Sequence, residues 1–294
     1  MTRLGLRAAI ACAGLAIQAL ADPAVVCLQT APPVAQENPP AIQSWKETRT
    51  KPRPLAIYVL KVDLRNPRVE IAAAIAPDPD GAGPADSQLA APLRLAEAHH
   101  LAAALNANAF GSLPGPDGKK STDWFEGMPV TVLSWAATKG ETVKGPELRY
   151  ADLWTDPQGK AHIEDLNRAV PVREAVAGFS QILKGGAFQC ETNGPLHPRS
   201  SVGLDSTARF MWLVAVDGRQ MDYSEGMTTY ELAVLMKSLG CSDAINLDGG
   251  GSTVLMAADE KDCLRILNCP SGRDAQGRVA PRPVPVLLGV KLKK

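Results

Sequence analysis

The stretch TTYELAVLMKSLGCSDAINLDGGGSTVLM, residues 228–256, carries the clearest signals of local structure in the chain. Thr228 and Glu231 have the spacing of a capping box, and Gly240 is placed to end the helix that the box begins. Between them, apolar residues recur at helical spacing: Leu232, Leu235, Met236 and Leu239. The pattern predicts a helix over 229–239 and then a short buried strand over 243–247.

This strand runs directly into Asp248 and three consecutive glycines, followed by Ser252 and Thr253. Consecutive glycines can turn several backbone N–H groups toward one point, and such concave backbone binds anions, phosphate above all. The two hydroxyls add further donors. The alternative is a tight turn in which Asp248 bonds its own backbone. The loop is neither a Walker A loop nor a G-x-S-x-G elbow, so composition alone leaves both interpretations open.

Strand patterns dominate the rest of the chain. Residues 55–64 and 69–76 are predicted to be strands joined by a turn, and residues 200–220 a hairpin whose second strand is apolar enough to be buried on both faces. A second helix is predicted over 92–105. We therefore predict an α+β fold over residues 55–294: a single domain with a mixed, mostly antiparallel β-sheet core and a few packed helices.

The N-terminal segment has the features of an export signal. Arg3 and Arg7 precede an apolar stretch that is too short to span a bilayer, and residues 19–21 read Ala-Leu-Ala, a typical cleavage site. Residues 1–21 are thus predicted to be a signal peptide, with a short membrane anchor as the weaker alternative. Residues 22–54 read as a proline-rich N-terminal arm or linker. We expect an exported protein, periplasmic or secreted, with no stable membrane span after cleavage.

Export would place the cysteines in an oxidising compartment. Five cysteines remain after the predicted cleavage, namely Cys27, Cys190, Cys241, Cys263 and Cys269. The odd number leaves at least one unpaired or intermolecular, and a local disulfide between Cys263 and Cys269 is the favoured pairing. No C-x-x-C pair occurs, which argues against a cysteine metal site.

The charge balance gives the chain no global basic field that would indicate nucleic-acid binding. Lysine plus arginine and aspartate plus glutamate both number 31, so the formal net charge is zero. We expect no nucleic-acid partner and no cofactor, although a divalent cation is compatible with the sequence.

Several other residues have both a functional and a structural interpretation. Arg199 suits bidentate binding of phosphate or carboxylate, or it pairs with a nearby acid on the surface. His197 suits acid–base chemistry, or it is a solvated loop residue. Asn106 suits sugar hydroxyls, or it ends a helix. Asp217 lies in an Asp-Gly turn, and Arg282 either reaches a ligand or caps the last strand.

Taken together, four segments in this order resemble the phosphodiester glycosidase family. They are HPRSSVGLD at 197–205, LVAVDGRQ at 213–220, the long segment at 224–256, and PRPVPVLLGV at 281–290. The resemblance runs from about Leu55 to Leu292 and is dense from Ala177 onward. One departure is the stretch NANAF at 106–110, where the family typically has Asn-Gly-Gly, an aromatic residue and Phe.

The resemblance implies an exported glycosidase that hydrolyses a sugar-1-phosphodiester, at the bond from glycosyl C1 through oxygen to phosphate. Asp248 would be the key carboxylate, with Glu231 or Asp217 as a second acid. The substrate would be a small molecule or an oligosaccharide. The residues implied to bind it are Asn106, Arg199, Asn246, Gly249, Gly250, Gly251, Ser252 and Arg282. Arg199, Arg282 and the three glycine amides would hold the phosphate.

Two other classes of function remain open at this point. One is a non-catalytic envelope protein that binds glycan or phosphoglycan in the same pocket, which the altered NANAF stretch would permit. The other is a serine hydrolase that uses Ser252, His197 and an aspartate, and the lack of an elbow motif argues against it.

Overall fold

The structure is a computed structural model that describes residues 40–293 except 167, 169 and 274–276. The predicted signal peptide, residues 22–39 of the arm and Cys27 lie outside the described residues. Within the described part, the chain forms two α-helices, α1 (Pro92–Ala98) and α2 (Thr229–Leu239), one 3-10 turn, η1 (Gly250–Ser252), and twenty strands. None of the described helices has the length and hydropathy required to cross a membrane.

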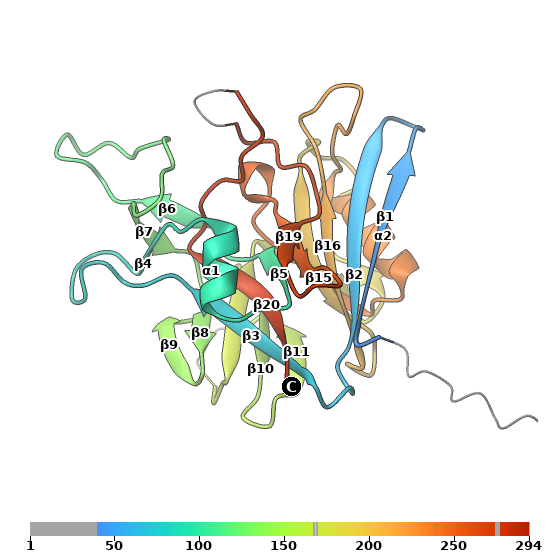
Figure 1. The fold of residues 1–294 in the computed structure, drawn as a ribbon, viewed down its shortest axis with the longest axis horizontal. Coiled ribbons are helices and arrows are strands. Elements are labelled where there is room, and N and C mark those ends of the chain that lie inside the picture. Colours follow the sequence, from blue (N-terminus) through green and yellow to red (C-terminus); the bar gives the residue numbers. More distant parts are fainter. Residues whose placement is uncertain (1–39, 167, 169, 274–276, 294) are drawn as a thin grey trace, which may run out of the picture. The chain divides into compact units, whose positions relative to one another are not determined.

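The largest sheet has seven strands in the order β1-β2-β16-β15-β17-β13-β14, and its β16 and β15 lie at the centre of Figure 1. Its strands are β1 (Ile42–Arg49), β2 (Leu55–Asp63), β16 (Phe210–Val216), β15 (Arg199–Leu204), β17 (Asp243–Asn246), β13 (Ser180–Lys184) and β14 (Ala187–Phe188).

Three smaller sheets complete the described fold. One has the order β11-β10-β12-β8-β9 and another the order β19-β18-β5-β20-β3, while β4-β7-β6 forms the smallest. Their strands are β11 (Ala161–Glu164), β10 (Ala151–Thr155), β12 (Glu174–Gly178), β8 (Ala136–Thr138), β9 (Glu141–Lys144), β19 (Leu264–Ile266), β18 (Leu255–Ala258), β5 (Ala103–Asn106), β20 (Val286–Leu292), β3 (Val69–Ile75), β4 (Ser87–Gln88), β7 (Pro129–Val132) and β6 (Phe110–Ser112).

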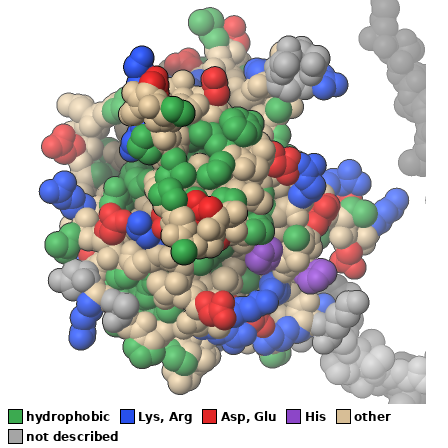
Figure 2. All heavy atoms as spheres, turned by 90° about the vertical axis from the view of Figure 1, so that its left-hand side faces the viewer, with side chains coloured by type: hydrophobic (Ala, Val, Ile, Leu, Met, Phe, Trp, Pro, Cys, Tyr) green, Lys and Arg blue, Asp and Glu red, His purple; other side chains and the backbone are tan. Residues whose placement is uncertain are grey.

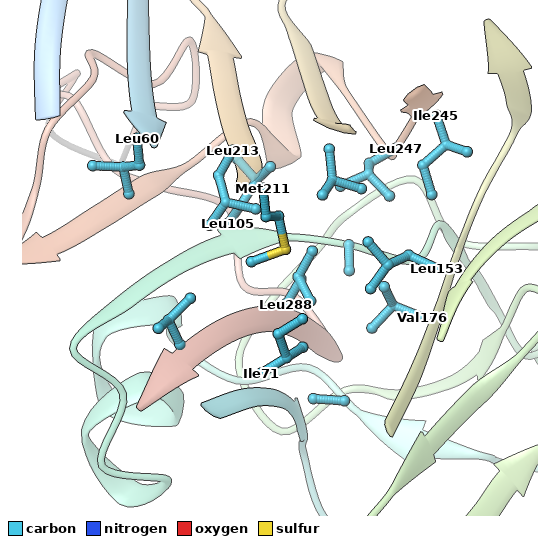
Figure 3. Packing of buried hydrophobic residues seen from close by; sticks show 14 of the residues in the cluster. Leu60, Ile71, Leu105, Leu153, Val176, Met211, Leu213, Ile245, Leu247 and Leu288 are labelled. Atoms are coloured by element: carbon cyan, nitrogen blue, oxygen red, sulfur yellow. The ribbon is translucent and has the colours of Figure 1, made fainter. Parts of the chain in front are cut away.

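One hydrophobic core is shared by the three larger sheets. Leu60 and Met211 come from the seven-stranded sheet, Leu105 and Leu288 from the sheet of β5 and β20, and Leu153 from β10. Figure 3 shows these side chains converging from separate strands. Because each sheet contributes one apolar face to the same core, the sheets stabilise one another by burying area that none could bury alone.

The central strand β16 is buried on both faces, as its sequence predicts. Leu213 faces the shared core, whereas Trp212 and Val214 pack in a second core beneath α2. The predicted capping box of α2 is present, and Gly240 ends the helix in the left-handed conformation at φ 103°. Acidic and basic side chains are interspersed on the molecular face drawn in Figure 2.

The fold is richer in strands than an α+β assignment implies. Every ladder among the described strands is antiparallel, so the sheets are not mixed, and helices are confined to α1 and α2. The predicted helix over 92–105 is wrong in its second half. It stops at Ala98, and Ala103–Asn106 pairs with β18 and β20 as β5.

Two further expectations differ from the structure. Residues 42–49 of the expected arm are extended, but they pair with β2 along their full length as β1. The four described cysteines are free thiols, so the favoured Cys263–Cys269 disulfide is absent. Instead, the Cys269 Sγ lies 3.4 Å from the Gln220 side chain, and the Cys263 backbone belongs to a turn closed by Asp259.

Candidate active site

A pocket of about 350 Å³ lies where three central strands begin or end. Antiparallel pairing places the start of β15 beside the end of β16, since Arg199 pairs with Val216, and the end of β17 beside β15, since Asn246 pairs with Ser201. The pocket lining comprises Phe179, His197, Pro198, Arg199, Arg219, Asn246, Leu247, Asp248, Gly249, Gly250, Gly251 and Arg282. The loop after β17 therefore supplies the floor of a site whose walls come from distant segments.

The three glycines are required by close approaches and by one strained dihedral angle. A Cβ on Gly249 would lie 2.6 Å from the Pro198 carbonyl oxygen, and Gly250 has φ 60°. The Gly250 N–H donates to that same Pro198 carbonyl over 2.9 Å, so it is not available to the anion that the sequence predicts this loop to bind. A Cβ on Gly251 would lie 2.5 Å from the Arg282 guanidinium. The glycines thus let backbone and arginine side chains approach one another around Asp248.

Asp248 is the carboxylate of this pocket. It is partly exposed to solvent but enclosed by protein on most sides, and burial raises its pKa to about 6. The Ser252 hydroxyl, the Arg282 charge and the Gly249 N–H lower the pKa by smaller amounts. A carboxylate with this pKa is mostly ionised at neutral pH, yet it is less well solvated than a surface aspartate. It is therefore suited to act on an electrophilic carbon.

Three arginines line the pocket together with Asp248, and none of them is neutralised by an ion pair among the described residues. Arg199 is buried, and its guanidinium donates to the Met227 and Pro195 carbonyls over 2.8 and 2.9 Å. Neither Arg199, Arg219 nor Arg282 has a carboxylate within 4.0 Å among the described residues. Burial lowers the pKa of Arg199 and of Arg282, and the Arg219 charge acts in the same direction on both. The pocket thus concentrates positive charge that suits an anion.

Asn246 adds an unsatisfied polar group at the same place. Its side chain is only 4% exposed, and its amide oxygen has no hydrogen-bond partner among the described residues. A buried acceptor without a donor is costly, so this oxygen is suited to receive a hydroxyl from a ligand. Ser252 is also buried; its hydroxyl acts on Asp248 but has no partner within normal hydrogen-bond geometry among the described residues, and it does not line the pocket.

Asn106 lies beneath the loop rather than in the pocket lining. Its amide nitrogen donates to the Asp248 carbonyl over 2.6 Å. Its amide oxygen accepts from the Ser200 hydroxyl and the Val254 N–H. With three partners and 1% exposure, Asn106 positions the Asp248 backbone and is too deeply buried to meet a sugar hydroxyl in the pocket.

Asp217 is likewise placed outside the pocket lining, in a network of its own. It accepts from the Asn268 side chain, the Cys269 N–H and the Tyr223 hydroxyl at 2.8, 2.9 and 3.1 Å. Burial raises its pKa, while these donors lower it in part. Because Arg219 follows two residues later, Asp217 anchors the start of the turn that presents Arg219.

Glu231 also acts through structure. Its carboxylate accepts the Thr228 N–H over 2.9 Å as half of the capping box, and it pairs with Arg53. Burial acts to raise the pKa of Glu231, but Thr228 and Arg53 together outweigh it and keep the pKa below the usual range. The Arg53 Nε donates to the Gly226 carbonyl, next to the Met227 carbonyl that holds Arg199. Glu231 does not line the pocket.

The sequence-based prediction assigns no role to two residues of the pocket lining, Phe179 and Arg219, whereas it considers His197 either as an acid–base group or as a solvated loop residue. Phe179 is 42% exposed, which is unusual for an aromatic side chain next to a buried strand. Arg219 follows the Asp-Gly turn in the segment 213–220, so the motif contained it but no signal separated it from other arginines. The serine-hydrolase alternative is not supported, because the His197 Nδ1 contacts Arg219 and not a serine.

The altered stretch 106–110 does not disturb the pocket. Ala107 and Asn108 are buried, and Asn108 donates to the Leu133 and Trp135 carbonyls while accepting the Ala177 N–H. None of residues 106–110 lines the pocket or has a positive φ. Among the described residues, no group of three or more His, Cys, Asp or Glu side chains is arranged to hold a metal ion.

The chain is similar to known proteins in sequence and in fold. A 57-residue stretch is 42% identical to the SPbeta prophage-derived uncharacterized protein YomE of Bacillus subtilis, and it spans 19% of this chain but only 8% of that protein. The catalytic domain of zebrafish N-acetylglucosamine-1-phosphodiester alpha-N-acetylglucosaminidase has a similar structure, with a TM-score of 0.62 and 18% identity over 88% of this chain and 85% of that chain.

A hypothetical protein from Synechocystis has a similar structure as well, with a TM-score of 0.54 and 14% identity over 86% of this chain and 62% of that chain. At these identities the structural likeness shows the fold. The sequence evidence is independent, since the family model described as phosphodiester glycosidase matches residues 131–291, more than half of the chain. The chain therefore belongs to the phosphodiester glycosidase family.

Proposed function

We propose that this protein hydrolyses the glycosyl C1–O bond of a sugar-1-phosphodiester, with Asp248 as the carboxylate at the anomeric carbon. The observation that supports this most strongly is the composition of the pocket, which holds one carboxylate among three arginines that lack ionic partners. The bond class is also the one named in the similar zebrafish protein.

The charge balance of the pocket suits this reaction. Cleavage of C1–O leaves the bonding electron pair on oxygen, so a phosphodiester monoanion departs as a monoester dianion. Arg199, Arg219 and Arg282 stabilise that added negative charge in the transition state. A phosphate monoester is a good leaving group without protonation, so the reaction needs no second carboxylic acid in the pocket. Water supplies hydroxide to C1 and releases its proton to solvent.

Asp248 then acts at the anomeric carbon. As an ionised group it attacks C1 directly or removes the proton from the attacking water. Asn246 accepts a sugar hydroxyl with its unpartnered oxygen, and the Gly251 N–H, which has no acceptor among the described residues, donates to the phosphoryl group. Asn106, Asp217 and Glu231 contribute by positioning these groups.

The test is a panel of sugar-1-phosphodiesters, beginning with an α-N-acetylglucosamine 1-phosphodiester, assayed with wild type and Asp248→Asn. We expect turnover by wild type and a loss of about 10³-fold or more in kcat for the variant. Asp248→Asn keeps the shape of the side chain, so its unchanged thermal unfolding serves as the folding control. Binding of the panel by wild type without any turnover would instead identify a glycan-binding protein.

The predicted signal peptide leads to a proposal on location. We propose that the protein acts after export, in the periplasm or outside the cell. Expression of the full chain and of a chain that lacks residues 1–21, followed by fractionation, tests it. Equal retention of both forms in the cytoplasm would contradict export.

A further inference from the structure

His197 and Arg219 form a contact that the proposed chemistry leaves without a role. The Arg219 Nη2 lies 3.3 Å from the His197 Nδ1, and both residues line the pocket beside Asp248. They come from different segments. His197 pairs through its backbone with Met227, and Arg219 sits at φ 59° in the turn that follows β16. Two segments are therefore held so that these side chains meet at the pocket wall.

The contact determines the tautomer of the imidazole. A guanidinium can donate hydrogen bonds but cannot accept them, so the His197 Nδ1 must be the unprotonated acceptor. The proton of the neutral ring then resides on Nε2. Burial lowers the pKa of His197, and the Arg219 and Arg199 charges that face the ring act in the same direction, whereas the Leu196 carbonyl acts more weakly to raise it. The ring is accordingly neutral at pH 7, with Nε2–H as the group left for a ligand.

We propose that Arg219 holds His197 in this tautomer so that Nε2–H donates a hydrogen bond to the leaving phosphoryl group. This inference rests on the proposed function and adds a specificity-determining pair to it. His197 transfers no proton, because a neutral imidazole is a very weak acid. His197 contributes a fixed N–H dipole, and the hydrogen bond from this dipole to the phosphate becomes stronger as the phosphate gains its second negative charge.

The pair also gives Arg219 a role that differs from the roles of Arg199 and Arg282. Arg219 is exposed at the rim, unlike the buried Arg199, and it raises the cost of keeping a proton on His197. Without Arg219, the ring would be free to rotate or to become protonated. The Nε2–H donor would then lose its fixed orientation, because that orientation depends on the hydrogen bond that Nδ1 accepts from Arg219. Arg219 thus acts on the phosphate by its charge and on His197 by orientation.

Amide substitutions test the position of the donor. In His197→Gln the side-chain amide nitrogen takes the place of Nε2, whereas in His197→Asn it takes the place of Nδ1. We expect His197→Asn and His197→Ala to lower kcat for the phosphodiester by about 10- to 100-fold, and His197→Gln to recover most of it. His100→Asn, at an exposed histidine outside the pocket lining, is the matched control.

A second substrate separates this inference from the proposed function. A glycosyl fluoride of the same sugar has no phosphate, so the His197→Asn and Arg219→Gln variants should lose at least about tenfold less kcat on it than on the phosphodiester. Asp248→Asn should lose activity on both substrates. If wild type turned over neither substrate, the proposed function would fail. If His197→Asn lowered kcat equally on both substrates, or on neither, the proposed function would stand and the donor role of His197 would be overturned.

The tautomer has a direct readout. In nitrogen-15 NMR of wild type at pH 7, the His197 Nδ1 should resonate as an unprotonated nitrogen and Nε2 as a protonated one, with the assignment taken from the His197→Gln spectrum. In Arg219→Gln we expect this single-tautomer pattern to average toward a mixture. A proton on Nδ1 in wild type would contradict the proposal.

Discussion

The amide nitrogen of Asn106, on β5, donates to the backbone carbonyl of Asp248 over 2.6 Å, across two different sheets. Asn106 pairs with Leu287 of β20, while Asp248 follows β17. The Asp248 N–H in turn donates to the carbonyl of Ala107 over 3.0 Å. The position of the pocket carboxylate is thus set by the packing of one sheet against another.

Removal of the Asn106 side chain should weaken both the fold and the site. Asn106→Ala leaves the Val254 N–H and the Ser200 hydroxyl without their acceptor in a buried place. We expect the free energy of unfolding to fall by about 2–4 kcal/mol and kcat to fall with it. Chemical denaturation and steady-state kinetics measure the two effects. A variant that lost substrate affinity alone, with full stability, would favour direct sugar binding by Asn106.

The pH dependence of the reaction should report Asp248. Because the folded-state pKa of Asp248 is about 6 and the proposed reaction uses its ionised form, kcat/KM should fall as pH drops through about 6. The Arg282 charge lowers that pKa, so Arg282→Gln should move the acid limb to higher pH, by about 0.5–1 unit. Arg65→Gln, at an exposed arginine outside the pocket, should leave the limb unmoved. A shift to lower pH in Arg282→Gln would be inconsistent with the assignment.

Alanine substitution should have different effects at different glycines of the loop. In Gly249→Ala the new methyl meets the Pro198 carbonyl, which is fixed backbone, whereas in Gly251→Ala it meets the flexible end of Arg282. We expect Gly249→Ala to cost about 2–4 kcal/mol of stability, and Gly251→Ala to cost less than about 1 kcal/mol while raising KM. Thermal unfolding and kinetics separate them, with Gly145→Ala as a control in open space. Equal losses in both variants would show that the loop moves as a unit.

The parts of the fold that sequence predicted well have local causes. The capping box of α2 needs only Thr228 and Glu231, and the burial of β16 on both faces follows from its unbroken apolar run. By contrast, residues 103–106 carry no local signal against a helix. They form β5 because β18 and β20 offer free edges on both sides, which is a tertiary effect.

The residues of the candidate site could likewise be predicted only where local sequence carries the signal. Asp248, Arg199 and Arg282 lie in distinctive segments, and the structure brings them to one pocket. Asn106, Asp217 and Glu231 lie in equally distinctive segments, but their side chains are occupied by hydrogen bonds within the protein. Sequence patterns do not distinguish a free polar group from a satisfied one. The role of an arginine such as Arg219 depends on the absence of a carboxylate nearby, which only the folded chain reveals.

Glu231→Gln tests the distinction between a catalytic and a positioning acid. Glutamine retains the hydrogen bond of the capping box, so only the ion pair with Arg53 is lost. We expect kcat within about threefold of wild type and a loss of less than about 1 kcal/mol in stability. Thr228→Ala, which removes the other half of the box, should cost about 1 kcal/mol. A loss of kcat in Glu231→Gln as large as that of Asp248→Asn would make Glu231 catalytic.

Asp152 links stability to pH away from the site. It is fully buried on β10, neither carboxylate oxygen has a hydrogen-bond partner within normal distance among the described residues, and burial raises its pKa to about 7. Between the unfolded value of 3.8 and the folded value of about 7, the folded chain binds more protons than the unfolded chain. The free energy of unfolding should therefore decrease as pH rises through this range.

Asp152→Asn should abolish this decrease. Asparagine has nearly the same shape and stays neutral, so the variant should be more stable than wild type by about 1–3 kcal/mol at pH 8 and nearly equal to it at pH 4. Urea denaturation at both pH values measures the difference. Asp117→Asn, at an exposed carboxylate, controls for the change in net charge. If the stability gain were the same at both pH values, the buried Asp152 carboxyl would not be the group that titrates.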